Sequence, residues 1–147
     1  MRNYRIYLLE EEFATHYFGR ESLLYQLFLD HAETTQVEYK TILEQQINFI
    51  TRPIPNLKIN QIISVALKKY KTYEQNKSSH FLKFQLPEGE AKLSISDRNL
   101  YLEAKGNLES ETIFFELLRK YNPCFLAMDF EQNRYGWLNP IKERKFV

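Results

Sequence analysis

The chain has 147 residues, a length that suits one domain with its own hydrophobic core. Its 20 basic and 19 acidic residues argue against a general nucleic-acid binder, and its one cysteine excludes an intrachain disulfide framework. Charges at Arg2, Arg5 and Glu10 interrupt the apolar core of a signal peptide, and no run of about 18 apolar residues occurs. We therefore expect a cytoplasmic protein without a membrane span.

The first third of the chain predicts a strand followed by two helices. Residues 3–8 alternate polar and apolar side chains, as in a strand with one buried face. The glutamates at 10–12 suit the positive N-terminal end of a short helix, and Gly19 suits its left-handed end. A second helix is expected from about residue 20 to 32, with a buried stripe of Leu23, Leu24, Leu27 and Phe28.

A third helix is predicted to end at Ile50, because Pro53 keeps the residue before it out of the helical region. The spacing of Thr35 and Glu38 is that of a capping box, which would begin the helix. Gln46 falls in the middle of an apolar arc, where a polar group is either buried with partners or faces a second protein. The arc consists of Tyr39, Ile42, Leu43, Ile47, Phe49 and Ile50.

The middle of the chain predicts one helix, a loop and three strands. Apolar residues at spacings of three and four indicate a helix over 59–70, and the polar stretch 72–79 is typical of a loop. Alternating runs at 81–86, 91–96 and 100–105 are separated by short turns. Such a pattern predicts an antiparallel meander.

The C-terminal third predicts a helix between Ser110, a plausible cap, and Pro123, which cannot continue it. The unbroken apolar run 124–128 indicates a strand covered on both faces, with a partner strand at 135–138. Residues 1–147 are therefore expected to form a single α+β domain with a mostly antiparallel sheet of about six strands and about five helices packed on it. The first strand should share this sheet with the C-terminal strands.

Motifs for catalysis or metal binding are missing from the sequence. The four glycines form no phosphate-binding loop, and His16, His31 and His80 are too scattered for a metal-ligand spacing. Cys124 lies in an apolar run, where a cysteine is usually a buried small residue. Asp129 is more often a turn carboxylate than a general base at such a position. We expect no catalytic residue, no cofactor and no metal.

Two alternative functions stay open at this point. Asp129 could mark an enzymatic or small-ligand-binding α+β domain, which a perturbed carboxylate in a pocket would support. The stretch 68–71 interleaves three lysines with Tyr70, as in a weak nucleic-acid-binding module. Without a net positive charge a solvated face is favoured, so no direct nucleic-acid contact is expected.

An unusually wide aromatic stripe marks the predicted first helix. Phe13 and Tyr17 stand one helical turn apart, as do Ala14 and Phe18, and together they cover an arc of about 140°. A helix docked on its own core needs a stripe only a little over about 100° wide. Aromatic pairs at this spacing usually belong to a core, and the pattern alone favours that interpretation here, but the extra width leaves one edge of the stripe for a contact outside the core.

Three stretches carry a resemblance to a known family. EEFATHYFGRES at 11–22, QINFITRPIP at 46–55 and the run from residue 111 to 147 together resemble the SirA family, sporulation inhibitors of replication in Bacillus-type bacteria. The resemblance runs essentially end to end, is dense at both termini and is weak between residues 57 and 106. A match of this length is far more specific than a short motif.

The resemblance implies a small non-enzymatic protein that binds the N-terminal domain I of the replication initiator DnaA and thereby stops new rounds of replication at the origin. It implies no cofactor, and we expect a monomer. The family's partner-binding surface carries over onto Phe13 and Tyr17 in the first helix and onto Gln46 and Phe49 in the third. Phe49 stands in place of a tyrosine in the family pattern.

Overall fold

An eight-stranded antiparallel sheet organises the computed structural model, which describes residues 1–139. Five helices pack on it, so the α+β prediction is confirmed, although the sheet has more strands than the six expected. In chain order the elements are β1 (Arg2–Leu9), α1 (Glu11–His16), α2 (Glu21–Glu33), α3 (Val37–Ile50), β2 (Thr51–Arg52), α4 (Asn56–Leu67), β3 (Glu74–Asn76), β4 (Ser79–Gln85), β5 (Glu88–Ile95), β6 (Leu100–Gly106), α5 (Glu109–Tyr121), β7 (Phe125–Asp129) and β8 (Arg134–Trp137).

The N-terminal strand shares the sheet with the C-terminal strands, as predicted, and lies in its interior. The strands follow the order β3-β4-β5-β6-β1-β7-β8, and β2 pairs with the end of β1. Ile6 pairs with Leu100 of β6 on one side and with Ala127 of β7 on the other. The C-terminal strands therefore complete a sheet that the first residues of the chain begin.

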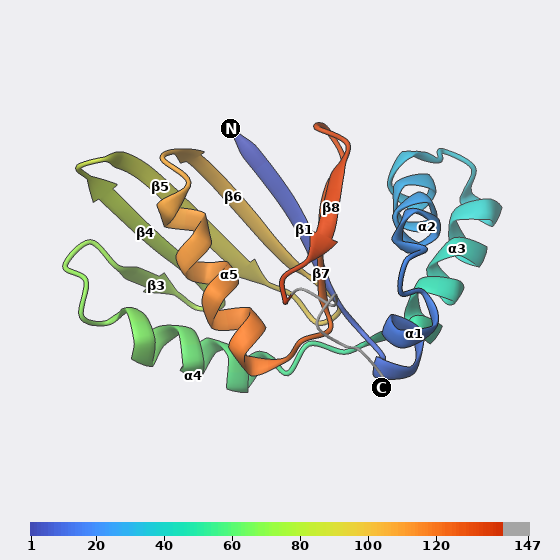
Figure 1. Ribbon diagram of the computed structural model, residues 1–147, viewed down its shortest axis with the longest axis horizontal. Helices are drawn as coiled ribbons and strands as arrows, with labels where there is room; N and C mark the ends of the chain where they lie inside the picture. The colour runs from blue at the N-terminus through green and yellow to red at the C-terminus, as the bar shows by residue number, and fades with distance from the viewer. Residues whose placement is uncertain (140–147) are drawn as a thin grey trace.

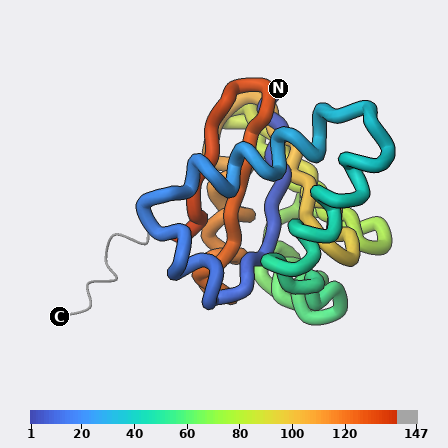
Figure 2. Tube along the Cα trace, turned by 90° about the vertical axis from the view of Figure 1, so that its right-hand side faces the viewer, coloured from blue at the N-terminus to red at the C-terminus, as the bar shows by residue number. Residues whose placement is uncertain are grey.

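Two groups of helices cover opposite faces of the sheet (Figure 1). α5 packs on one face, where the Phe115 ring lies 5.1 Å from the Tyr4 ring, and α4 packs beside α5. α1, α2 and α3 gather at the β1-β7-β8 end, and Figure 2 shows α2 crossing in front of these strands. There Phe28 of α2 lies 4.4 Å from Tyr7 of β1. Because helices cover both faces here, every residue of β7 is buried, as the apolar run predicted.

Edge positions account for the strands that the sequence did not reveal. The predicted loop at 72–79 is wrong, because it contains β3, which pairs with β4. All three β3 side chains are exposed, so this edge strand has no hydrophobic alternation to detect. β2 has only two residues and directly follows α3.

Helix starts differ from the capping predictions. α3 begins at Val37 without a side-chain cap, so the predicted capping box is wrong; instead Thr34 Oγ1 accepts a hydrogen bond from the Gln36 N–H at 3.2 Å. Ser110 lies inside α5, buried, and its hydroxyl donates to the Asn107 carbonyl.

On α2, Leu23 is exposed and Tyr25 is buried instead, because the helix presents a slightly rotated face to the sheet.

Residues 140–147 lie outside the described residues, although they belong to the C-terminal stretch of the resemblance. Within residues 1–139, no helix combines the length and the apolar composition needed to cross a membrane.

His80 of β4 is a fully buried histidine that joins the sheet to α4. Its Nδ1 accepts a hydrogen bond from the Tyr73 hydroxyl, and its Nε2 donates to Oδ1 of Asn60, both at 2.7 Å. The Asn60 amide nitrogen in turn donates to Ser78 Oγ, which fixes the amide orientation. Burial lowers the pKa of His80 from 6.5 to about 4, so the ring is neutral in the folded protein at physiological pH.

This histidine should make folding sensitive to mild acid. Below its unfolded pKa the unfolded chain binds a proton that the folded protein excludes, so stability falls as pH drops from about 6.5 towards 4. Between pH 7 and 5.5 we expect a loss of about 1 kcal/mol in the free energy of unfolding. Urea denaturation at both pH values measures it, with His80→Gln as the control. An equal pH dependence in the control would assign the loss to other groups.

Candidate partner-binding groove

The short helix α1 is joined to the end of α3 and packs against the core. The Glu10 N–H donates to the carbonyl of Ile50 at 2.9 Å, which ties the start of α1 to the end of α3. After α1 the chain turns at Gly19, whose positive φ of 82° is readily adopted by glycine. Ala14 points into the core with no exposed surface. The remaining stripe of α1 therefore faces along α3.

A hollow of about 470 Å³ lies between α1, α2 and α3, and all four partner-binding residues expected from the sequence line it. This groove contains no charged side chain. Its lining consists of Phe13, Tyr17, Leu27, Ile42, Gln45, Gln46, Phe49 and Ile50. The structure thus brings two segments, around residues 13–17 and 42–50, onto one uncharged surface.

The aromatic residues of the groove differ in how firmly they are packed. Phe13 and Tyr17 are half-buried: both contact the hydrophobic core and both also line the groove. Phe49 is 73% exposed, and the centroid of its ring lies 5.4 Å from that of the Phe13 ring. An exposed phenylalanine of this kind, beside two half-buried aromatic rings, is typical of an interface anchor.

Gln46 is exposed beside these aromatic side chains. Its amide makes no hydrogen bond with any residue in the described part of the chain. The alternative in which Gln46 is a core residue bonded to its own backbone is therefore wrong. The amide is free to bond to a second protein, where a buried polar group needs a partner.

The groove also contains residues that the sequence did not single out for binding. Leu27 was assigned to a buried stripe and Ile42 to the apolar arc of the third helix, yet Leu27 is only half-buried and Ile42 is 52% exposed. Gln45 and Ile50 complete the wall. The sequence feature that could have indicated Ile42 and Ile50 is the apolar arc of the third helix, which is wider than one buried face requires.

Comparison with known proteins identifies the family. A model of the family described as "Sporulation inhibitor of replication protein SirA" matches residues 2–142. A curated relative of that name from Bacillus subtilis (strain 168) is 46% identical over 147 residues, covering 99% of each chain.

The chain belongs to the SirA family.

The resemblance seen in the sequence is thereby confirmed, and the family match includes every element that builds the groove. SirA is named as an inhibitor, which indicates a regulatory role rather than catalysis.

Arg98, in the turn between β5 and β6, holds the end of α3 that carries the groove. Its Nη2 donates to the carbonyls of Asn48 and Thr51 at 3.0 and 3.1 Å, and to Thr51 Oγ1 at 3.0 Å. A cation at a helix C-terminus also interacts favourably with the helix dipole. Since Phe49 is largely exposed, its position depends on the backbone that this guanidinium holds. Nothing in the local sequence of a turn could indicate a contact 47–50 residues away.

Replacing Arg98 by alanine should weaken both partner binding and the stability of the fold, because it removes the hydrogen bonds that hold the end of α3. We expect each loss to be about 1 kcal/mol. Thermal unfolding and a binding titration on the same samples measure both. Thr72→Val is the control, because it removes the bond from Thr72 Oγ1 to the Lys83 carbonyl far from the groove. If both variants bind the partner equally well, Arg98 has only a structural role.

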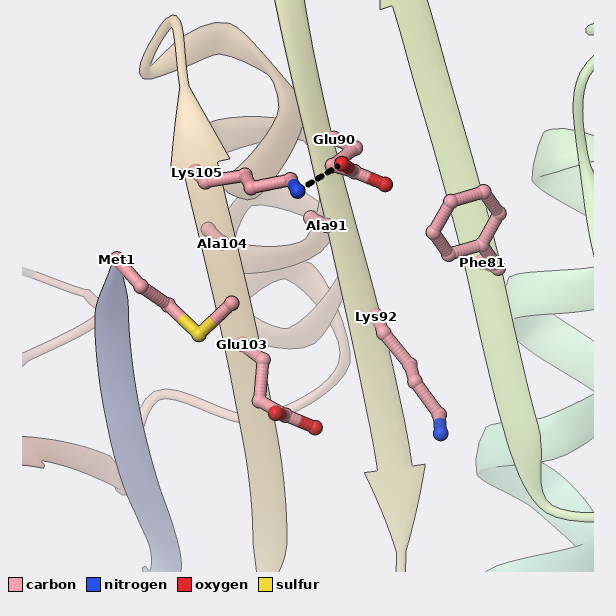
Figure 3. A pocket seen from close by; sticks show the side chains of 8 residues that line it. All are labelled: Met1, Phe81, Glu90, Ala91, Lys92, Glu103, Ala104 and Lys105. Carbon is pink, nitrogen blue, oxygen red and sulfur yellow. Dashed lines mark ion pairs between the residues drawn. The ribbon is translucent and has the colours of Figure 1, made fainter.

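The open face of the sheet contains another hollow, which is lined by two lysines and two glutamates (Figure 3). Lys105 Nζ lies 3.0 Å from a carboxylate oxygen of Glu90, and Lys92 lies opposite Glu103 in the strand register. Alternating opposite charges on one sheet face are typical of a solvated surface.

The cleft between α5 and β8 also has its charged groups occupied. Arg119 pairs with Glu116 at 2.8 Å, and Arg134 pairs with Asp129 at 3.0 Å. Asp129 also accepts a hydrogen bond from the Gln132 N–H at 3.1 Å, as expected of a turn carboxylate. Cys124 is buried.

A buried carboxylate lies near this cleft. Glu111 accepts hydrogen bonds from Arg2 and from the Tyr4 hydroxyl. Burial and this bond raise the pKa of Tyr4 to about 12. Among residues 1–139 no three potential metal ligands of the His, Cys, Asp or Glu type come together.

Proposed function

We propose that this SirA-family protein inhibits the initiation of chromosome replication during sporulation by binding domain I of DnaA through the groove. One observation supports this above all. The four positions that the family resemblance assigns to partner binding come from two helices, yet all of them line the same uncharged hollow. The family name supplies the biological setting.

The composition of the groove suits protein recognition. Interface cores are depleted of charge and enriched in aromatic anchors with a few polar groups, as in the combination of Phe13, Tyr17, Phe49 and Gln46. Binding here would occupy a surface of domain I. If domain I uses that surface for other initiation proteins or for self-association, inhibition follows by mass action, without turnover or a cofactor.

Capture of DnaA from the cytoplasm of a sporulating bacterium tests the proposal, followed by titration with purified domain I. The wild-type protein should retain DnaA, and Phe49→Asp should lose it, because a charge would enter the centre of the contact. Leu86→Asp is the matched control, since Leu86 is 94% exposed at the hairpin between β4 and β5, away from the groove. Failure to retain DnaA, or equal retention by Phe49→Asp, would contradict the proposal.

A further inference from the structure

The segment that contains the groove helices carries a net negative charge, unlike the rest of the chain. Residues 10–50 contain eight acidic side chains against only Arg20 and Lys40, a formal net charge of −6. Because the whole chain carries +1, the remaining residues carry +7. The lining of the groove itself contains no charged side chain.

Two carboxylates precede groove residues in the sequence: Glu10 is the N-cap directly before α1, and Glu38 lies within α3. Glu10 comes one helical turn before Phe13, and its backbone N–H is bonded to the end of α3. Glu38 comes one turn before Ile42 on α3, on the stripe that continues through Phe49. Both side chains are exposed, and neither takes part in an ion pair within residues 1–139.

The two basic side chains of this region differ in their position, with Arg20 next to the groove and Lys40 away from Glu38. The Arg20 guanidinium donates to the His16 carbonyl at 2.7 Å and lies over the Tyr17 ring at 5.9 Å. Lys40 lies two residues after Glu38 and so projects from the opposite side of α3.

We infer that the partner surface that fits this groove is an apolar ridge bordered by lysine or arginine side chains, and that these charges speed its association. The inference rests on the proposed function, since it describes the face of domain I that docks. An apolar ridge would bury the uncharged lining, while basic side chains would meet Glu10 and Glu38 at the rim. A partner with an acidic border would be repelled, because like charges at an interface oppose binding.

Stopped-flow association of domain I with the full chain tests this. The wild-type association rate should fall about tenfold or more between roughly 50 and 500 mM NaCl, as electrostatically steered rates do. The double variant Glu10→Gln with Glu38→Gln should associate about fivefold more slowly at low salt, while its dissociation rate changes less than about twofold. The control, Glu88→Gln with Glu103→Gln, changes net charge equally on the sheet and should associate at the wild-type rate.

Three results would overturn the inference alone, with the proposed function intact. Domain I could bind at a rate that salt does not change, the groove variant could associate as fast as wild type, or the control variant could slow equally. Lack of binding by the wild-type protein would instead overturn the proposed function and this inference with it.

Discussion

Alanine at Phe13 or at Tyr17 should each weaken binding of domain I by about 2 kcal/mol or more, as the loss of aromatic anchors does. The same changes should lower the free energy of unfolding by only about 1 kcal/mol, because both rings are half-buried and leave no closed cavity. Isothermal titration calorimetry and thermal unfolding on the same samples measure the two effects.

Phe84→Ala is the matched control for these variants. Phe84 is also a half-buried aromatic residue, and it packs 5.7 Å from Tyr70 at the far end of the molecule. Its truncation should reduce stability without changing the affinity for domain I. If instead Phe13→Ala and Tyr17→Ala each lower stability by about 3–5 kcal/mol, the cost of emptying a packed core site, the pair belongs to the core rather than to an interface.

Sequence patterns predicted most of the sheet, including the edge strand β8, but missed the two-residue β2 and the exposed edge strand β3. Periodicity revealed β1 and β7. The apolar run of β7 correctly indicated burial on both faces, but the single buried face predicted for β1 is wrong, because residues 6–9 are all buried and Tyr7 packs under α2. β3 is held by hydrogen bonds to β4 while its side chains remain in water, and backbone pairing leaves no pattern in the side chains.

The candidate site was predictable to a similar extent. Phe13 and Gln46 stood out because each breaks the simple rule for a docked helix, one by widening a stripe and the other by placing an amide within it. Leu27 could not be assigned to the groove, because whether a leucine on a buried stripe also reaches the surface depends on the angle between α2 and its neighbours. Arg98 could not be found either, since its role depends on contacts with a distant helix end.

Gln46 offers the most specific test of the groove, because its effect on binding should be large and its effect on folding small. Gln46→Ala should reduce domain I affinity by about 1–3 kcal/mol, since it leaves a polar group of the partner buried without a hydrogen bond. Gln46→Arg should reduce it further, by about 3 kcal/mol or more, because a charge would enter a desolvated contact. The exposed amide has no bond to lose in the free protein, so neither change should destabilise it.

Calorimetric titration of domain I with both variants measures these losses, and Gln61→Ala is the control, an exposed glutamine on α4 away from the groove. The arginine variant also tests whether basic side chains of the partner border the groove. If partner cations border the groove, an arginine at position 46 adds like-charge repulsion to the desolvation cost, so its excess loss over alanine should shrink at high salt. Unchanged affinity in Gln46→Ala would remove Gln46 from the interface even if Phe13 and Tyr17 remain in it.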